Sequence, residues 1–310
     1  MPEIPPNSLI AMGSVFGLLV LATGTRLILA ARNPGKDYTE LRQRIQSWWW
    51  IVGSLFVVLA VSQEAAIAFF GFLSFLALKE FLSIVPTRHA DRRVIFWAYL
   101  AIPVQYYWVY IGWYGMFMIF VPVYLFLFLP MRMVLIGETK GFIKSASLLH
   151  WAVMLTVFCI SHIAYLLRLE PLNARAGSVG LVLFLIFTTQ FNDICQYIWG
   201  KMLGRHKIIL KVSPNKTWEG FIGGLVTITL CAGWIAPLLT PLTRTQGLVA
   251  GIIIASSGFI GDVVVSSVKR DLQIKDSGQL IPGHGGILDR LDSLFYAAPL
   301  FFHYIYYLCY

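Results

Sequence analysis

The sequence predicts an all-α, polytopic integral membrane protein with about ten transmembrane helices. Of its 310 residues, 58% are hydrophobic and only 13% are charged, and the charged share is about half of that usual in a soluble domain. The mean hydropathy is +0.73. Apolar runs long enough to cross a bilayer recur along the whole chain. A soluble protein can be this apolar locally, but not along its whole length.

Ten apolar runs have roughly the length of a transmembrane helix. The second and third runs are separated only by Gln63-Glu64, and the fourth and fifth only by Gly112-Trp113, so we expect two tight helical hairpins. In order, the runs are Leu9 to Ala30, Trp48 to Ser62, Ala65 to Ile84, Ile95 to Ile111, Tyr114 to Leu129, His150 to Leu167, Gly180 to Trp199, Gly220 to Leu239, Leu248 to Val268 and Leu291 to Cys309.

The basic residues are concentrated in alternate loops between these runs. Twenty of the 24 Lys and Arg residues fall on one side, in five of the loops or at the run ends beside them. Three fall on the other side, and Arg26 lies inside the first run. Positively charged loops stay on the cytoplasmic side of a membrane. We therefore expect both termini outside, the five basic loops in the cytoplasm, and a bacterial inner membrane as the location.

The net charge of +9 is explained by this placement of basic residues. The sequence has no pattern typical of a nucleic-acid surface, so we expect no nucleic-acid partner. The four cysteines are far apart in apolar runs, which argues against a disulfide framework or a zinc site. An anionic lipid head group or a nucleotide is a natural partner for the basic loops.

The polar residues suggest two functional halves within one integrated membrane domain. Residues 1–172 have short loops without a phosphate-binding motif, and we expect them to form an N-terminal transmembrane scaffold. Glu64 and Glu80, at the two ends of the third run, are interpreted as interface acids. Residues 173–310 hold nearly every intramembrane acid and both long basic loops, which predicts a C-terminal catalytic region.

The most polar stretch of the chain, residues 267–292, lies between two long apolar runs. Its Pro-Gly-His-Gly-Gly turn includes His284, Gly285 and Gly286, and such a backbone can adopt positive φ and approach an anion closely. We expect His284 to hydrogen-bond or position a phosphate group rather than to transfer a proton. The stretch also supplies positive charges suited to phosphate groups, namely Lys269, Arg270, Lys275 and Arg290.

Three carboxylates accompany these basic residues. Asp262 lies inside an apolar run, two helical turns before Lys269. Asp289 and Asp292 are three residues apart, so both point the same way if that segment is helical. Three carboxylates directed at one point repel one another unless a cation binds, and hard oxygen ligands suit magnesium better than zinc.

Asp193 is a further acid near the end of an apolar run. A bare carboxylate in hydrocarbon costs roughly 2.5 to 3.5 kcal/mol on insertion scales, so we expect it to face protein, water or a cation. The alternative is a helix-end acid that reaches the interface or is bonded to Asn192 or Tyr197.

The loop before the eighth run contains a second candidate element. Ser213 followed by Pro214 predicts a helix start, because the hydroxyl can cap free N–H groups and proline needs none there. Lys216 and Thr217 would then lie in the first helical turn, where anions bind favourably. The alternative is an ordinary basic loop with a helix cap.

The order of these residues resembles the signature of the CDP-diacylglycerol synthases, also called phosphatidate cytidylyltransferases. The shared pattern is Ser-x-Lys-Arg from Ser267, Lys-Asp from Lys275, Pro-x-His-Gly-Gly from Pro282 and Asp-Arg-x-Asp from Asp289. The segment from Ser213 to Gly220, and Asp193 with Tyr197, resemble two other elements of that family. The resemblance covers about the last 120 residues.

The resemblance implies that phosphatidic acid attacks the α-phosphorus of CTP and that CDP-diacylglycerol and pyrophosphate are formed. It implies a homodimer and a Mg²⁺ cofactor, with a second cation such as K⁺. Asp262 and Asp289 would ligate magnesium with help from Asp292, while Lys269 and Arg270 would join Asp262 and Asp289 as catalytic residues. The implied substrate-binding residues are Ser213, Lys216, Thr217, Glu219, Asp193, Ser267, Lys275, Asp276, His284, Gly285, Gly286 and Arg290.

One position departs from the family pattern. Gln196 stands where the family commonly has alanine, between Asp193 and Tyr197, and this change bears on which nucleotide or lipid is accepted. A CTP-dependent cytidylyltransferase or kinase for an isoprenoid or ether lipid is therefore the alternative. A transporter is less favoured, because no internal repeat is visible in the sequence.

Overall fold

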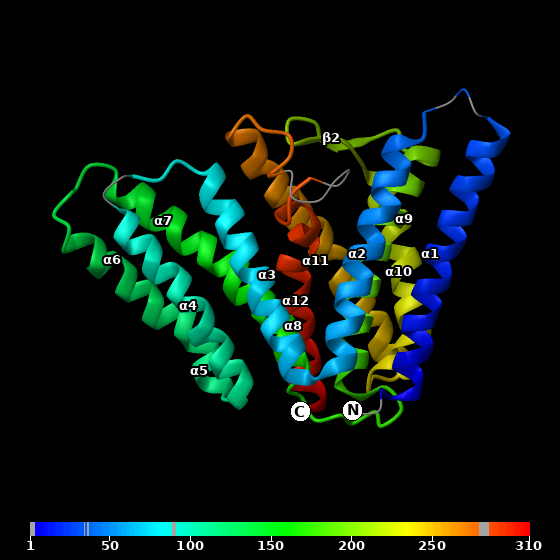
Figure 1. Cartoon of the computed structure of the whole chain (residues 1–310), viewed down its shortest axis with the longest axis horizontal. Coiled ribbons are helices and arrows are strands. Elements are labelled where there is room, and N and C mark those ends of the chain that lie inside the picture. Colours follow the sequence, from blue (N-terminus) through cyan, green and yellow to red (C-terminus); the bar gives the residue numbers. More distant parts are fainter. Residues whose placement is uncertain (1–3, 34, 36, 89–90, 279–284) are drawn as a thin grey trace.

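The computed structural model describes residues 4–33, 35, 37–88, 91–278 and 285–310, and long helices dominate it (Figure 1). The first part of the chain forms a series of helices that rise and descend in turn. Their bounds are α1 Pro6–Arg32, α2 Thr39–Val61, α3 Gln63–Ile84, α4 Arg92–Ile111, α5 Tyr114–Ile119, η2 Phe120–Leu125, α6 Phe126–Val134, α7 Phe142–Val153, η3 Met154–Cys159 and α8 Ile160–Leu166.

The second part contains four longer helices and one hairpin. The hairpin pairs β1 with β2 in antiparallel register, with Lys207 opposite Thr217 and Ile209 opposite Ser213. The bounds are α9 Gly177–Leu203, β1 Lys207–Ile209, β2 Ser213–Thr217, α10 Trp218–Leu239, α11 Arg244–Asp271 and α12 Leu288–Cys309.

The helices confirm the predicted polytopic membrane fold. Among the described residues, nine helical segments are long and apolar enough to cross a membrane, and α5–η2–α6 and α7–η3–α8 each form one such segment. The tenth predicted run is α12, a helix of 22 residues whose first turns carry Asp289 and Asp292. These two charges lower the mean hydropathy of α12. The same two residues belong to the candidate site.

The basic loops gather at one end of the molecule. The start of α1 and the end of α12 lie at the opposite end, at the bottom of Figure 1, while the β1–β2 hairpin and the end of α11 lie at the top. The basic residues are concentrated in the loops after α1, α3, α6, α9 and α11 and in the helix ends that adjoin these loops. The alternating charge pattern thus matches the alternating direction of the helices.

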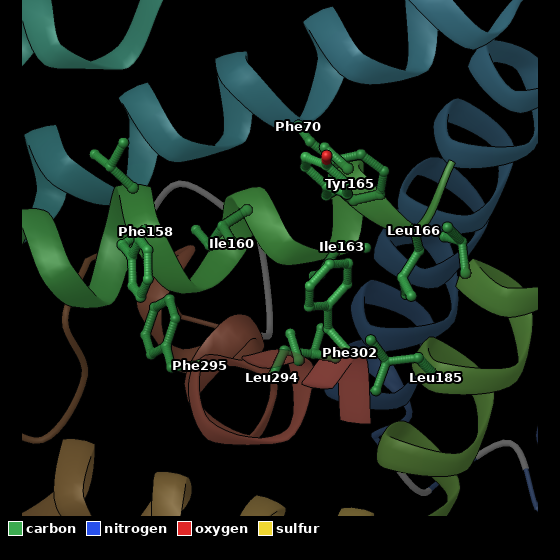
Figure 2. Close-up of a cluster of buried hydrophobic side chains, with 14 of the residues drawn as sticks. Phe70, Phe158, Ile160, Ile163, Tyr165, Leu166, Leu185, Leu294, Phe295 and Phe302 are labelled. Carbon is green, nitrogen blue, oxygen red and sulfur yellow. The ribbon is translucent and has the colours of Figure 1, made fainter. Parts of the chain in front are cut away.

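One hydrophobic core joins the two halves of the chain. Figure 2 shows Phe70 of α3, Ile163 of α8, Leu185 of α9 and Phe302 of α12 within one buried cluster. All four side chains are almost completely removed from solvent. The N-terminal helices therefore pack directly against the helix that carries Asp289 and Asp292.

Glycine residues let α11 approach its neighbours closely. A Cβ atom on Gly261 would collide with the main-chain oxygen of Asp292 and would lie 3.3 Å from the Cα of Ser293. A Cβ on Gly251 would lie 2.8 Å from Thr229 of α10. This close packing places Asp262, the residue after Gly261, beside the start of α12.

The expectation of a helix starting at Ser213 is wrong. Residues Ser213–Thr217 form β2, and α10 begins at Trp218. Because a residue before proline is biased toward extended backbone, Ser213 continues the hairpin instead of capping a helix. Thr217 takes the N-cap position, and its Oγ1 accepts a hydrogen bond of 3.2 Å from the Gly220 N–H. Lys216 therefore lies in the strand just before the helix.

Candidate active site

The hairpin places Lys216 against α11. Its Nζ lies 2.6 Å from Oδ2 of Asp262 and 4.4 Å from the centre of the Phe259 ring. The side chains of Lys216 and Asp262 are only 16% and 28% exposed. This ion pair joins β2 to α11.

Asp262 is also close to acids from two other helices. Electrostatic repulsion links it to Asp193 of α9 and to Asp292 of α12. The Ser266 hydroxyl donates a hydrogen bond of 3.1 Å to Asp262 Oδ1, and the Ser293 hydroxyl lies 3.0 and 3.1 Å from the two carboxylate oxygens of Asp193. Asp193 therefore faces the protein interior and bonds to α12, not to Asn192 or Tyr197.

Asp289 lies in a second ion pair. Lys269 Nζ donates a hydrogen bond of 2.7 Å to Asp289 Oδ1, and the two side chains are 13% and 6% exposed. The other oxygen, Oδ2, accepts from the backbone N–H groups of Ser277 at 2.9 Å and Gly286 at 3.0 Å. The first turn of α12 and the end of the α11–α12 loop thus hold Asp289 in one orientation.

Gly285 and Gly286 make room for these contacts. Gly285 has a φ of +79°, which glycine adopts without the steric cost other residues incur. A Cβ at this position would lie 2.6 Å from Asp289 Oδ2. Of the predicted Pro-Gly-His-Gly-Gly turn, Pro282, Gly283 and His284 lie outside the described residues.

The sequence-based interpretation of Glu80 as a simple interface acid is wrong. Its Oε1 accepts a hydrogen bond of 2.5 Å from the Ser277 hydroxyl and one of 3.0 Å from the Leu288 N–H. Its Oε2 accepts a bond of 2.9 Å from the Ile287 N–H. The sequence shows only that Glu80 is an acid at the end of α3, near basic loops. Its partners could not be recognised, because they lie about 200 residues away in the chain.

The remaining predicted residues divide into those near this network and those at its edge. Arg290 follows Asp289, its Nε is buried without a hydrogen-bond partner among the described residues, and its charge attracts Asp193. Arg270 is exposed and donates to the Val212 carbonyl at 3.2 Å. Ser267 donates to the Val263 carbonyl within α11 at 2.9 Å.

Three other predicted residues have more open positions. Lys275 and Asp276 are exposed in the α11–α12 loop. Glu219 accepts hydrogen bonds from the backbone N–H groups of Arg205 at 3.0 Å and His206 at 3.2 Å, and lies 2.6 Å from Nδ1 of His206. Glu219 thereby orders the turn between α9 and β1. An open cavity of about 420 Å³ at this turn is lined partly by Arg205, His206 and Glu219.

The donor chemistry of the network fits a hard divalent cation. Among the described residues, no group of three or more His, Cys, Asp and Glu side chains is already arranged as a metal site. The network nevertheless combines four aspartates with three basic side chains, so its carboxyl groups outnumber its basic groups. The four aspartates are Asp193, Asp262, Asp289 and Asp292, and the three basic residues are Lys216, Lys269 and Arg290. An all-oxygen donor set of carboxyl groups suits magnesium.

Comparison with known proteins supports one family. The model of the Cytidylyltransferase family matches residues 42–308. The protein YnbB of Escherichia coli (strain K12), described only as uncharacterized, is 44% identical over 300 residues, which cover 97% of this chain and 99% of that protein.

Two named enzymes match a smaller region. The phosphatidate cytidylyltransferase of Staphylococcus saprophyticus subsp. saprophyticus is 36% identical over 158 residues, which are 48% of this chain and 59% of that enzyme. The phosphatidate cytidylyltransferase of Mycobacterium leprae is 41% identical over 115 residues, which are 37% of each chain. Because the family model spans most of the sequence, this multi-pass membrane protein belongs to the cytidylyltransferase family.

Proposed function

We propose that the chain transfers CMP from CTP to phosphatidic acid and so produces CDP-diacylglycerol and pyrophosphate. The observation that carries this proposal is the pair of ion pairs, Lys216–Asp262 and Lys269–Asp289, at the basic end of a membrane helix bundle. Asp292 connects them electrostatically, because it interacts with both Asp262 and Lys269. The two phosphatidate cytidylyltransferase relatives support the choice of lipid.

In the proposed reaction, a phosphate oxygen of phosphatidic acid attacks the α-phosphorus of CTP. A new P–O bond forms there, the bond between the α-phosphorus and its bridging oxygen to the β-phosphorus breaks, and pyrophosphate leaves. Both reactants are anions, so the protein must place positive charge around them and align the two oxygens. Lys269 and Lys216 bind phosphate oxygens in this proposal, with Arg270 and Lys275 at the more exposed edge.

Asp262, Asp289 and Asp292 would hold Mg²⁺, and Asp193 adds negative charge to the same region. When bound, the cation would neutralise the charge that develops on the phosphoryl oxygens. Asp289 keeps its orientation through Ser277 and Gly286, and Asp193 keeps its orientation through Ser293. These residues thus fix the oxygen donors before substrate arrives.

The location of the site completes the proposal. CTP is a cytoplasmic nucleotide, and positively charged loops stay on the cytoplasmic side, so the basic end would face the cytoplasm of a bacterial inner membrane. The head group of phosphatidic acid would reach the site from the bilayer surface. As the family resemblance implies, the enzyme would act as a homodimer, with residues 1–172 as its scaffold and 173–310 as its catalytic region.

Purified full-length protein, incubated with radiolabelled CTP, Mg²⁺ and single lipids, tests this proposal. The lipids are phosphatidic acid, an isoprenyl phosphate, an isoprenoid alcohol and an ether-lipid phosphate. We expect labelled CDP-diacylglycerol and an equal amount of pyrophosphate with phosphatidic acid, and no turnover after chelation of Mg²⁺ until the cation is restored. Labelled product only with another lipid, or turnover that survives chelation, would refute the proposed reaction.

A further inference from the structure

Glu80 is the point at which the N-terminal half touches the candidate site. Its carboxylate accepts three hydrogen bonds from the C-terminal half, from the Ser277 hydroxyl and from the N–H groups of Ile287 and Leu288. The N–H groups at a helix start have no partner within the helix, and a negative charge there interacts favourably with the helix dipole. Glu80 of α3 therefore caps the start of α12, because the N-cap residue, Ile287, has no capping side chain.

The Glu80 carboxylate leaves no room for a side chain at the neighbouring glycines, Gly278 and Gly286. A Cβ atom on Gly286 would collide with Glu80 Oε1 and would also lie 2.5 Å from the Ser277 hydroxyl oxygen. A Cβ on Gly278 would lie 2.9 Å from Glu80 Oε2. The last glycine of the Pro-Gly-His-Gly-Gly turn is thus needed partly because a side chain from α3 occupies the space.

Ser277 links Glu80 to Asp289. Its hydroxyl oxygen lies 2.5 Å from Glu80 Oε1 and 2.9 Å from Asp289 Oδ2, although a hydroxyl has one hydrogen to donate. The hydrogen can serve only one carboxylate at a time, while the Ser277 N–H continues to donate to Asp289. The sequence of contacts Glu80, Ser277, Asp289, Lys269 is therefore continuous.

We propose that Glu80 is a positioning residue of the active site. It fixes the start of α12 and the Ser277 hydroxyl, and through them it sets the orientation in which Asp289 meets Lys269 and binds the cation. This inference rests on the proposed function for its catalytic consequence. Its structural part, the ordering of residues 285–292 by Glu80, stands independently of which lipid the enzyme uses.

Glu80→Gln tests the proposal with little change of shape, because glutamine keeps the length of the side chain but loses the charge and one acceptor oxygen. Ser277→Ala removes the connecting hydroxyl as a second route to the same question. Glu64→Gln is the matched control, since Glu64 is an exposed acid at the opposite end of α3. Each full-length variant would be compared with the wild type by amide hydrogen exchange and by steady-state kinetics.

We expect Glu80→Gln to accelerate exchange in peptides covering 285–292 while the exchange of α9 and α10 stays unchanged. It should lower kcat about tenfold or more, as the loss of hydrogen bonds to a charged group implies. The KM for CTP should change less than threefold, and the Mg²⁺ concentration for half-maximal rate should rise. Combining Glu80→Gln with Ser277→Ala should cost no more than the more severe single change, because both act through Asp289.

Three results would overturn the inference: wild-type exchange in residues 285–292, an exchange increase spread over the whole chain, or single effects that multiply in the double variant. If the wild-type protein makes no CDP-lipid from phosphatidic acid, the proposed function fails. The exchange comparison still decides in that case whether Glu80 orders the start of α12. The two failures are therefore distinguishable.

Discussion

Replacing Asp289 with asparagine removes one charge from the more deeply buried of the two ion pairs. The wild-type carboxylate accepts from Lys269 on one oxygen and from the N–H groups of Ser277 and Gly286 on the other. An asparagine amide has one oxygen and one NH₂ group. Whichever way the amide turns, its NH₂ group opposes either the ammonium group or the two backbone donors, so one side of the network loses its acceptor.

The size of the effect follows from burial. The Asp289 side chain is 6% exposed and that of Lys269 is 13% exposed, and removing one partner of a buried ion pair costs about 3 to 5 kcal/mol. Since each 1.36 kcal/mol is a factor of ten in rate, loss of the same energy from the transition state lowers kcat/KM by about 150-fold to 5,000-fold. We therefore expect a reduction of at least about 100-fold in Asp289→Asn.

The assay is formation of labelled CDP-lipid by purified protein, with membrane insertion and thermal unfolding measured in parallel. Asp271→Asn is the control, because Asp271 is an exposed acid at the end of α11; it should retain the wild-type rate. A correctly inserted Asp289→Asn variant that turns over at the wild-type rate would refute the assignment of Asp289 to the site.

Two further predictions concern the fold that supports the site. Gly261→Ala should force α11 away from Asp292, lower the free energy of unfolding by about 1 to 3 kcal/mol and lower the activity. Gly17→Ala is the control and should change neither, because the space around Gly17 is open. Equal melting temperatures for the wild type and Gly261→Ala would contradict this close approach. Burial acts to raise the pKa of Asp91, but hydrogen bonds from Arg88 and Ser145 outweigh it and hold that pKa below its usual range. Asp91 therefore stabilises the folded protein above its unfolded pKa of about 3.9 and loses this contribution as the pH falls through the lower folded pKa. Asp91→Asn should lower the melting temperature at pH 7, and its difference from the wild type should shrink below about pH 4; a difference independent of pH would count against the ion pair.

The membrane fold could be predicted from the sequence because its physical basis is local. A transmembrane helix must satisfy its backbone hydrogen bonds internally and present apolar side chains to lipid, so each span leaves a continuous signal in the chain. The two tight helical hairpins could also be predicted from the sequence. In the structure α2 and α3 are separated by Ser62 alone, and α4 and α5 by Gly112 and Trp113. The β1–β2 hairpin was missed because its pairing gains support from α9 and α10, whereas Ser213-Pro214 has the local features of a helix cap.

The candidate site could be predicted only in part. Asp262 and Lys269 lie on one helix, so their helical spacing revealed a common face. Asp193 was recognised as an unusual acid, but its bond to Ser293 depends on the packing of α9 against α12. Glu80 was misread because the partners of its carboxylate, Ser277, Ile287 and Leu288, lie about 200 residues away in the sequence. Residues that meet only through tertiary packing leave no periodic trace in a single sequence.

The position of Glu80 changes how the two halves of the chain relate to one another. An N-terminal region that served only as a scaffold would need apolar contacts with α12, of the kind seen around Phe70 and Phe302. Apolar packing alone, however, does not fix the rotation of a helix start to within a hydrogen bond, whereas a carboxylate that accepts from two successive N–H groups does. Because α3 supplies that carboxylate, the orientation of Asp289 depends on the first half of the chain as well as on the conspicuous motif in the second.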